Sequence, residues 1–79
     1  MKIRIFSTPF CPYCVALKSY LDDNNIIYEY LDVSDNIPAQ KEMIEKTNQI
    51  GVPVMNIGDE WIIGFDKAKI AQILGIKEK

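Results

Sequence analysis

The sequence predicts an α/β fold in a single domain spanning residues 1–79. Three observations predict this class. Short runs rich in β-branched and aromatic residues alternate with amphipathic, helix-compatible segments in the order β-α-β-α-β-β-α. Two cysteines, Cys11 and Cys14, lie between the first expected strand and the first expected helix. The length allows one small hydrophobic core, so nearly every element has to contribute to it.

The first strand and the first helix flank the cysteine pair. Residues 2–6 alternate charged and apolar side chains, which is typical of a strand. Pro12 suits the first turn of a helix, where its missing N–H costs little. We expect this helix to run from Pro12 to Asp22 or Asp23 and to end at Asn24-Asn25, because Asn tolerates a left-handed cap. Its buried face should hold the residues spaced i, i+3 and i+7, which are Cys14, Leu17 and Leu21.

A second strand and helix follow in the middle of the chain. Residues 26–31 are rich in β-branched and aromatic side chains and predict the strand. Pro38 should begin the helix, with Asp35 or Asn36 as its cap, and the helix should reach about Thr47. Its apolar stripe is expected to consist of Ala39, Met43 and Ile44.

The last third of the chain predicts a hairpin and a closing helix. Residues 52–57 form a strand that opens with a proline, Gly58-Asp59 is a turn signal, and residues 60–63 return. Asp66 can cap the last helix, and Gly75 can end it. The inward-facing residues of that helix are expected to be Ile70, Ile73 and Leu74.

Composition excludes several classes of function. A formal net charge of −2 makes nucleic acid or an anionic membrane an unsuitable partner. The chain has no histidine, which removes the usual general base and the usual zinc ligand. No secretory signal or membrane-spanning run is visible, so we expect a cytoplasmic protein. Thiols are kept reduced in the cytoplasm, where a C-x-x-C pair is more often catalytic or metal-binding than structural.

Three segments together make the chain resemble a glutaredoxin of the thioredoxin-fold superfamily. They are Cys11-Pro12-Tyr13-Cys14 after the first strand, Val52-Pro53 at the opening of the third, and Gly64-Phe65-Asp66 before the last helix. The resemblance covers nearly the whole chain. It implies a thioredoxin-like fold, in which three helices flank a four-stranded mixed sheet, and the activity of a thiol–disulfide oxidoreductase. We expect a monomer. The short length most resembles small glutaredoxin-like redoxins, some of which serve ribonucleotide reductase.

The resemblance also implies which residues form the site. It implies a cis peptide bond before Pro53 and a loop that lies beside the cysteine pair, where the backbone of Val52 pairs with the bound thiol substrate. Cys11 and Cys14 are the implied catalytic residues. The implied substrate-binding residues are Pro12, Tyr13, Val52, Pro53, Gly64, Phe65 and Asp66. Asp66 is equally well explained as a helix cap.

Position along the helix predicts different roles for the two thiols. Cys11 should lie at the mouth of the helix, where unpaired N–H groups and the helix dipole favour an anion. Cys14 lies one turn further in and should stay a thiol. We therefore expect Cys11 to attack the disulfide of a protein substrate and Cys14 to resolve the resulting mixed disulfide. An external reductant then resets the pair.

The identity of that reductant depends on positions that differ from glutathione-using relatives. Those relatives commonly carry a lysine three residues before the first cysteine, where this chain has Thr8. They often carry a basic residue and a threonine just before the Val-Pro loop, where this chain has Gln49, Ile50 and Gly51. Because charge-assisted contacts to the carboxylates of glutathione are the strong ones, we expect exchange with a protein partner and a thioredoxin-reductase-type electron source. Glutathione stays open as a co-substrate, and no bound cofactor or metal is expected.

Two alternatives for the cysteine pair stay open. One is a structural disulfide or an inert buried pair. The other is a dimeric metal or iron–sulfur carrier that uses the Cys11 thiolate, because one chain offers two thiols where a zinc site needs about four ligands. Pro12 and Tyr13 disfavour a cluster, since cluster-binding relatives usually differ there.

Overall fold

The computed structural model describes residues 2–76, so residues 1 and 77–79 of the predicted domain lie outside the described residues. Within the described range, seven elements follow one another in the predicted order β-α-β-α-β-β-α. They are β1 (Ile3–Ser7), α1 (Pro12–Asp23), β2 (Glu29–Asp32), α2 (Ile37–Thr47), β3 (Val54–Ile57), β4 (Glu60–Ile63) and α3 (Lys67–Leu74). The predicted α/β class is confirmed.

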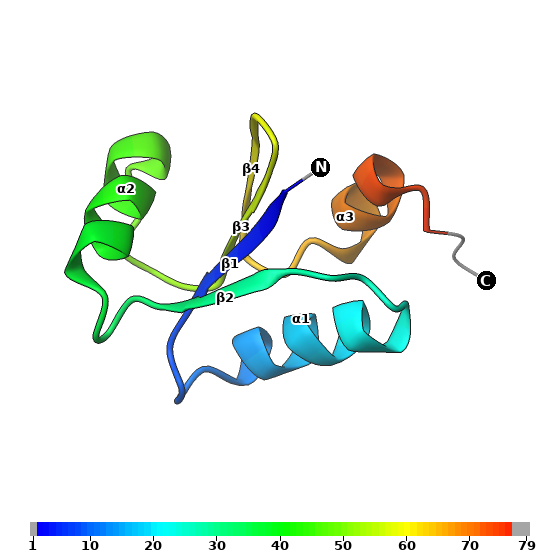
Figure 1. The fold of residues 1–79 in the computed structure, drawn as a ribbon, viewed down its shortest axis with the longest axis horizontal. Coiled ribbons are helices and arrows are strands. Elements are labelled where there is room, and N and C mark those ends of the chain that lie inside the picture. The colour runs from blue at the N-terminus through cyan, green and yellow to red at the C-terminus, as the bar shows by residue number, and fades with distance from the viewer. Residues whose placement is uncertain (1, 77–79) are drawn as a thin grey trace.

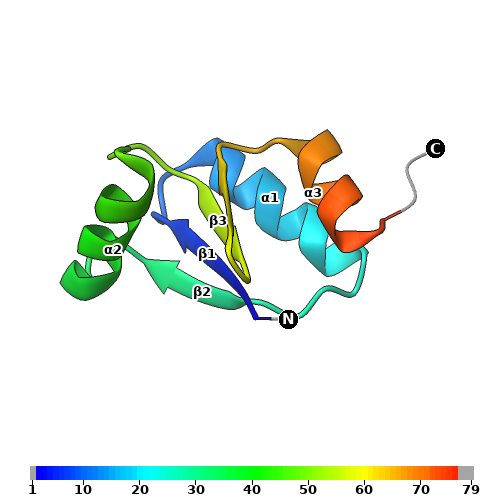
Figure 2. The same cartoon turned by 90° about the horizontal axis from the view of Figure 1, so that it is seen from above.

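The four strands form one mixed sheet in the order β2-β1-β3-β4. β1 is parallel to β2 and antiparallel to β3, and β3 pairs with β4 in the hairpin. Helices α1 and α3 cover one face of this sheet and α2 covers the other (Figures 1 and 2). This is the thioredoxin-like arrangement that the resemblance implied. β1 occupies the interior of the sheet, and the cysteine segment follows directly from its carboxyl end.

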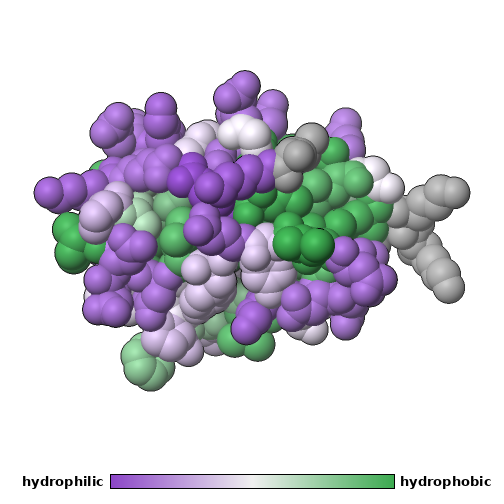
Figure 3. Space-filling model, in the orientation of Figure 1, coloured by the Kyte–Doolittle hydropathy of each residue, from purple (hydrophilic) through white to green (hydrophobic). Residues whose placement is uncertain are grey.

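Two hydrophobic clusters fill the two sides of the sheet, because successive side chains of a strand point to opposite faces. The cluster beneath α1 and α3 contains Ile3, Ile5, Leu17, Leu21, Met55, Ile57, Ile62 and Ile70. The cluster beneath α2 contains Phe6, Val33, Ala39, Met43 and Val54. The ring of Trp61 packs on that of Phe6, with centroids 5.4 Å apart. The face shown in Figure 3 is mostly hydrophilic, and its largest apolar area lies beside α3.

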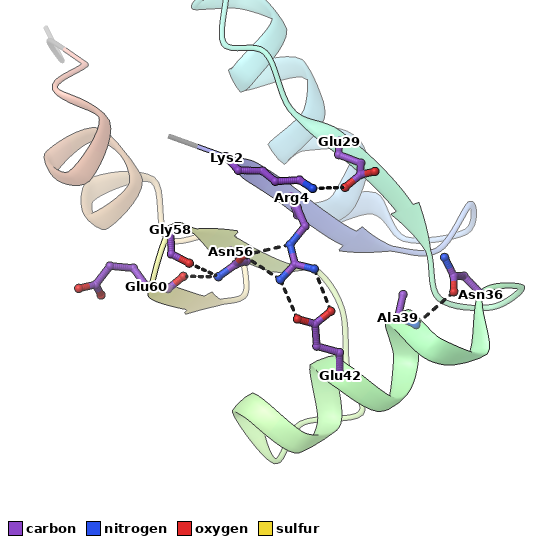
Figure 4. A network of polar contacts seen from close by, with 9 residues as sticks. All are labelled: Lys2, Arg4, Glu29, Asn36, Ala39, Glu42, Asn56, Gly58 and Glu60. Carbon is purple, nitrogen blue, oxygen red and sulfur yellow. Dashed lines mark hydrogen bonds and ion pairs between the residues drawn. The ribbon is translucent and has the colours of Figure 1, made fainter.

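A polar network ties α2 to the sheet (Figure 4). The Arg4 guanidinium donates to both carboxylate oxygens of Glu42 at 2.8 Å, and to Oδ1 of Asn56 at 2.9 and 3.0 Å. It also lies over the rings of Phe6 and Trp61. The hydrogen bonding between Arg4 and Glu42 lowers the pKa of the Glu42 carboxyl and raises the pKa of the Arg4 guanidinium. A bidentate pair of this kind fixes the helix in position as well as stabilising it.

Most predicted boundaries and caps are close to those observed. α1 spans Pro12–Asp23 as predicted, and the left-handed residue after it is Asn25 (φ 58°). The cap of α2 is Asn36, whose side chain accepts the Ala39 N–H. Asp66 caps α3, and Gly75 ends it with φ 70°.

The second and third strands are shorter than predicted. β2 begins at Glu29 rather than residue 26, because the Ile26 N–H still bonds the Leu21 carbonyl at the end of α1. β3 begins at Val54 rather than residue 52, because β1 offers no partner beyond the Phe6–Val54 pair. The first strand is shifted by one residue, to 3–7.

The predicted apolar faces of the two later helices need smaller corrections. The placement of Ile44 in the buried stripe of α2 is wrong, since 36% of its surface is exposed to solvent. In α3, the predicted inward face is confirmed, since Ile70 is buried and the half-buried Ile73 and Leu74 pack against the same hydrophobic cluster. Ala71 completes that face. No helix within residues 2–76 has the length and apolarity needed to cross a membrane.

Candidate dithiol site

Cys11 lies at the N-terminus of α1 and forms its cap. Its backbone is extended (φ −105°, ψ 113°), and its carbonyl accepts the Val15 N–H at 3.1 Å. Its Sγ accepts the N–H of Cys14 at 3.2 Å. A side-chain acceptor at this position satisfies one of the N–H groups that a helix leaves unpaired. The positive end of the helix therefore faces the sulfur, which is the arrangement that favours a negative charge there.

Cys14 lies in the first turn of α1 and is buried, with 3% of its surface exposed, whereas Cys11 is half-buried. Both are free thiols in this structure. Burial, and then the hydrogen bond with Cys11, raise the pKa of Cys14 above that of an ordinary thiol. Contacts with Ser7 and Thr8 act in the opposite direction without cancelling this effect. The two thiols thus differ in access and in environment, as their positions along the helix predicted.

The loop before β3 lies against the cysteine pair. The Val52–Pro53 peptide bond is cis, as the resemblance implied. The thiol of Cys11 is 3.8 Å from the carbonyl oxygen of Val52, close enough for a weak S–H donor. The Pro53 side chain is buried, and its carbonyl accepts the Gly64 N–H at 2.8 Å. This bond ties the loop to the residue after β4, so the sheet itself holds the loop beside the dithiol.

The other implied substrate-binding residues lie in different environments. Pro12 and Tyr13 are exposed between the thiols, with 69% of the Tyr13 surface accessible. Phe65 is half-buried and packs against Tyr20 of α1, with ring centroids 5.8 Å apart. The Asp66 carboxylate accepts the Lys69 N–H at 3.1 Å as the cap of α3. The structure thus brings Val52 to the dithiol, and engages Phe65 and Asp66 in packing and capping.

A small pocket behind Cys14 was not anticipated from the sequence. Its volume is about 120 Å³, and its lining consists of Ser7, Thr8, Pro9, Cys14, Val15, Lys18 and Tyr30. One signal in the sequence could have indicated it. Ser7 continues the alternating row of Ile3 and Ile5, so a hydroxyl occupies a position where the pattern calls for an apolar side chain. Across residues 2–76, no group of three or more Cys, Asp or Glu side chains is arranged to hold a metal ion.

Comparisons with known proteins agree with this geometry. The family model described as Glutaredoxin matches residues 3–62. An uncharacterised glutaredoxin-like 8.6 kDa protein from Clostridium pasteurianum is 42% identical over 72 residues, which cover 91% of this chain and 96% of that protein. Glutaredoxin 3 of Escherichia coli is 28% identical, and the match covers 81% of this chain and 77% of that one.

Solved structures show the same likeness. The crystal structure of a mutant of the thioredoxin-like protein BC3987 superposes with a TM-score of 0.91 at 33% identity, covering 96% of this chain and 97% of that one. A buckwheat glutaredoxin–glutathione complex superposes with a TM-score of 0.73 at 25% identity, covering 92% and 69%.

The fold and the free dithiol at the start of α1 define a thioredoxin-like protein with a thiol redox function. Within that class, the chain belongs to the glutaredoxin family, since the family model spans three quarters of its length.

Proposed function

We propose that this protein reduces disulfide bonds of protein substrates by dithiol exchange through Cys11 and Cys14. The observation that carries the proposal is the asymmetry of the pair. Cys11 is half-buried and its sulfur accepts a helix N–H, whereas Cys14 is buried with a raised pKa. The thiolate is the attacking species in exchange. A less buried cysteine in an anion-favouring environment suits the first attack, and a neighbouring thiol that keeps its proton suits the second.

The exchange follows in two steps. The Cys11 thiolate attacks one sulfur of the substrate disulfide, a Cys11–substrate disulfide forms, and the other substrate sulfur leaves as a thiolate that takes up a proton. Cys14 then loses its proton and attacks the sulfur of Cys11. The mixed disulfide breaks, the second substrate thiol is released, and Cys11–Cys14 is left oxidised. Two electrons pass from the dithiol to the substrate, and an external reductant restores the dithiol.

The carbonyl of Val52 supports a docking role for the loop before β3. It lies beside the Cys11 sulfur at the position where β3 has no strand partner on β1. A substrate segment in extended conformation could pair with this free backbone edge, as peptides do at exposed strand edges. Tyr13, exposed between the thiols, would then offer its ring to the same segment.

The electron donor is proposed from the side chains around the dithiol. Among the exposed side chains in the segments that flank it, three are large and apolar or aromatic: Phe10, Tyr13 and Ile50. Glutathione, which the buckwheat relative binds, carries two carboxylates, and charge-assisted bonds to them are the strong ones. An apolar rim suits a protein partner better, so we propose a reductase of the thioredoxin-reductase type as the electron source, in the cytoplasm.

Trapping the mixed disulfide tests the mechanism. The Cys14→Ser variant, mixed with insulin, whose two chains are joined by disulfides, and analysed by mass spectrometry, should carry an insulin chain on Cys11. The Cys11→Ser variant is the matched control and should carry none. Failure of the first variant to form any adduct would rule the mechanism out, and zinc or an iron–sulfur chromophore in anaerobically purified protein would favour the carrier alternative. The electron donor is identified by comparing the rate of NADPH consumption with thioredoxin reductase and the rate with glutathione plus glutathione reductase. The proposal expects the faster turnover with thioredoxin reductase.

A further inference from the structure

Val52 connects the dithiol with the side of the sheet that α2 covers. Its carbonyl oxygen lies 3.8 Å from the sulfur of Cys11. Its side chain is half-buried and packs against the hydrophobic cluster beneath α2, which contains the fully buried Met43 of that helix. A displacement of α2 on the sheet would therefore move the surface against which Val52 packs, and with it the carbonyl beside Cys11.

The loop that joins α2 to β3 has few contacts of its own to hold Val52 in place. At one end the Asn48 N–H bonds the last turn of α2, and at the other the Pro53 carbonyl accepts the Gly64 N–H. Between these ends, none of the N–H groups of residues 50–52 donates a hydrogen bond to a described residue. An added Cβ at Gly51 would meet only open space. The position of this loop thus depends on the two elements that it joins.

The position of α2 is set by Glu42, the residue next to Met43. Its two carboxylate oxygens accept hydrogen bonds of 2.8 Å from the Arg4 guanidinium of β1 (Figure 4). The guanidinium is itself held by Asn56 of β3, whose Oδ1 accepts two more of its N–H groups. Asn56 is buried, and its amide donates to two carbonyls of the β3–β4 turn. The carboxylate of α2 therefore binds a cation that three hydrogen-bonded strands keep in one place.

This ion pair supplies what the hydrophobic contacts of α2 lack. Burial of apolar surface is non-directional, whereas a bidentate guanidinium–carboxylate pair fixes both distance and direction. The Arg4 guanidinium also lies 5.1 Å from the ring centroid of Phe6 and 5.7 Å from that of Trp61. Phe6 belongs to the cluster against which both Trp61 and Val52 pack. The ion pair and Val52 thus meet the same packed side chains.

We propose that Arg4 and Glu42 are positioning residues for substrate docking, because their ion pair holds α2, and through the cluster beneath it the Val52 carbonyl, beside Cys11. The inference rests on the proposed function and concerns its first step, in which the substrate backbone meets Val52 and Cys11 attacks. Neither residue of the pair touches the substrate. A disulfide too small to reach the backbone edge gains nothing from the pair.

The experiment compares two disulfides that have the same leaving group. One is a short peptide whose single cysteine carries a 2-hydroxyethylthio group. The other is bis(2-hydroxyethyl) disulfide, which has no backbone to dock. Attack of the Cys11 thiolate on the peptide sulfur, or on either sulfur of the small disulfide, forms a mixed disulfide and releases 2-mercaptoethanol. Mass spectrometry in the Cys14→Ser background gives the rate constant for each adduct on Cys11.

We expect Glu42→Gln and Arg4→Met each to lower the rate constant for the peptide about 2–5-fold and that for the small disulfide less than about 1.5-fold. The loss is modest because a partly exposed ion pair contributes little and the nucleophile itself is unchanged. In the Arg4→Met background, adding Glu42→Gln should lower the rate constant no further, since the pair is already broken. Glu42→Gln keeps nearly the same shape, so it preserves the test if Arg4→Met disturbs folding.

Glu29→Gln is the matched control. It breaks the exposed pair of Glu29 with Lys2, whose charged atoms are 3.8 Å apart, on β2 and away from α2. This variant loses a carboxylate as Glu42→Gln does, and it should change neither rate constant.

The outcomes separate the two proposals. Equal losses for both disulfides would show that the variants act on Cys11 or on folding, and the inference would be wrong. It would also be wrong if neither Glu42→Gln nor Arg4→Met slowed the peptide, if Glu29→Gln slowed it as much, or if the losses multiplied in the double variant. If the Cys14→Ser protein forms no mixed disulfide with either compound, the proposed function itself fails, whatever the variants of the ion pair do.

Discussion

The sulfur of Cys11 has a structural role that is separable from its chemistry, because it caps α1. Its bond from the Cys14 N–H is 3.2 Å long, and the first turn of α1 has no acidic side chain to replace it. Losing an N-cap acceptor costs about 0.5–2 kcal/mol, typically about 1. We therefore expect Cys11→Ala to destabilise the protein by about 1 kcal/mol. For a domain of this length, that lowers the melting temperature by about 6 °C.

Cys11→Ser should lose activity and keep stability, since the hydroxyl is itself a preferred cap. Its free energy of unfolding should stay within about 0.5 kcal/mol of the unmodified protein. Urea unfolding under reducing conditions measures the free energy of unfolding of the unmodified protein, of Cys11→Ala and of Cys11→Ser. The other two helices calibrate the effect, because Asn36 and Asp66 accept N–H groups at 3.1 Å in the same position. If Asn36→Ala and Asp66→Ala lose stability while Cys11→Ala is as stable as the unmodified protein, the sulfur is not an effective cap.

Three further predictions concern stability. The pKa of Glu42 is lowered by its hydrogen bond from Arg4, so this stabilisation is present above the pKa of an unfolded glutamate and is lost as pH falls. Because both partners are partly exposed to solvent, Glu42→Gln should lower the free energy of unfolding by about 0.5–1 kcal/mol near neutral pH and by less below a pH of about 4, as measured by urea unfolding. A loss of stability that is the same at both pH values would contradict this. Burial raises the pKa of Tyr28 to about 12. One tyrosine should ionise late in an absorbance titration, Tyr28→Phe should abolish that phase, and stability should fall from pH of about 10 upward. Gly64 has φ +78° with open space around an added Cβ, so Gly64→Ala should cost about 1–2 kcal/mol through backbone strain alone, whereas Gly51→Ala should not.

Local sequence signals predicted the elements well because they act over a few residues. Pro12, Asp66 and Gly75 mark helix ends through backbone constraints that hold in any fold. Strand ends were predicted less well, because a strand ends where its neighbouring strand stops pairing with it, and the local sequence does not show where that is. Residues 26–28 have the composition of a strand, yet they lie outside the pairing of β1 with β2.

The site residues also differ in whether the local sequence or only the fold identifies them. The roles expected for Cys11 and Cys14 followed from their positions along one helix, and the difference in burial agrees with them. The proximity of Val52 came from the family resemblance, since nothing local joins residues 41 positions apart. Ser7 was overlooked because a single serine in a strand is ordinary. Only the packing of β1 against α1 shows that its hydroxyl is buried beside Cys14.

The distance along the chain between Cys11 and Val52 also has a consequence for assembly of the protein. The strand, helix and parallel strand of the first half need shorter loops than the pairing of β1 with β3, and contacts between distant residues form late because closing a long loop costs more entropy. During synthesis, both cysteines therefore leave the ribosome before the segment that covers one side of them exists. A nascent chain therefore carries both thiols before the Val52 carbonyl lies beside Cys11, and until β3 joins the sheet only the chemistry of the surroundings keeps them reduced.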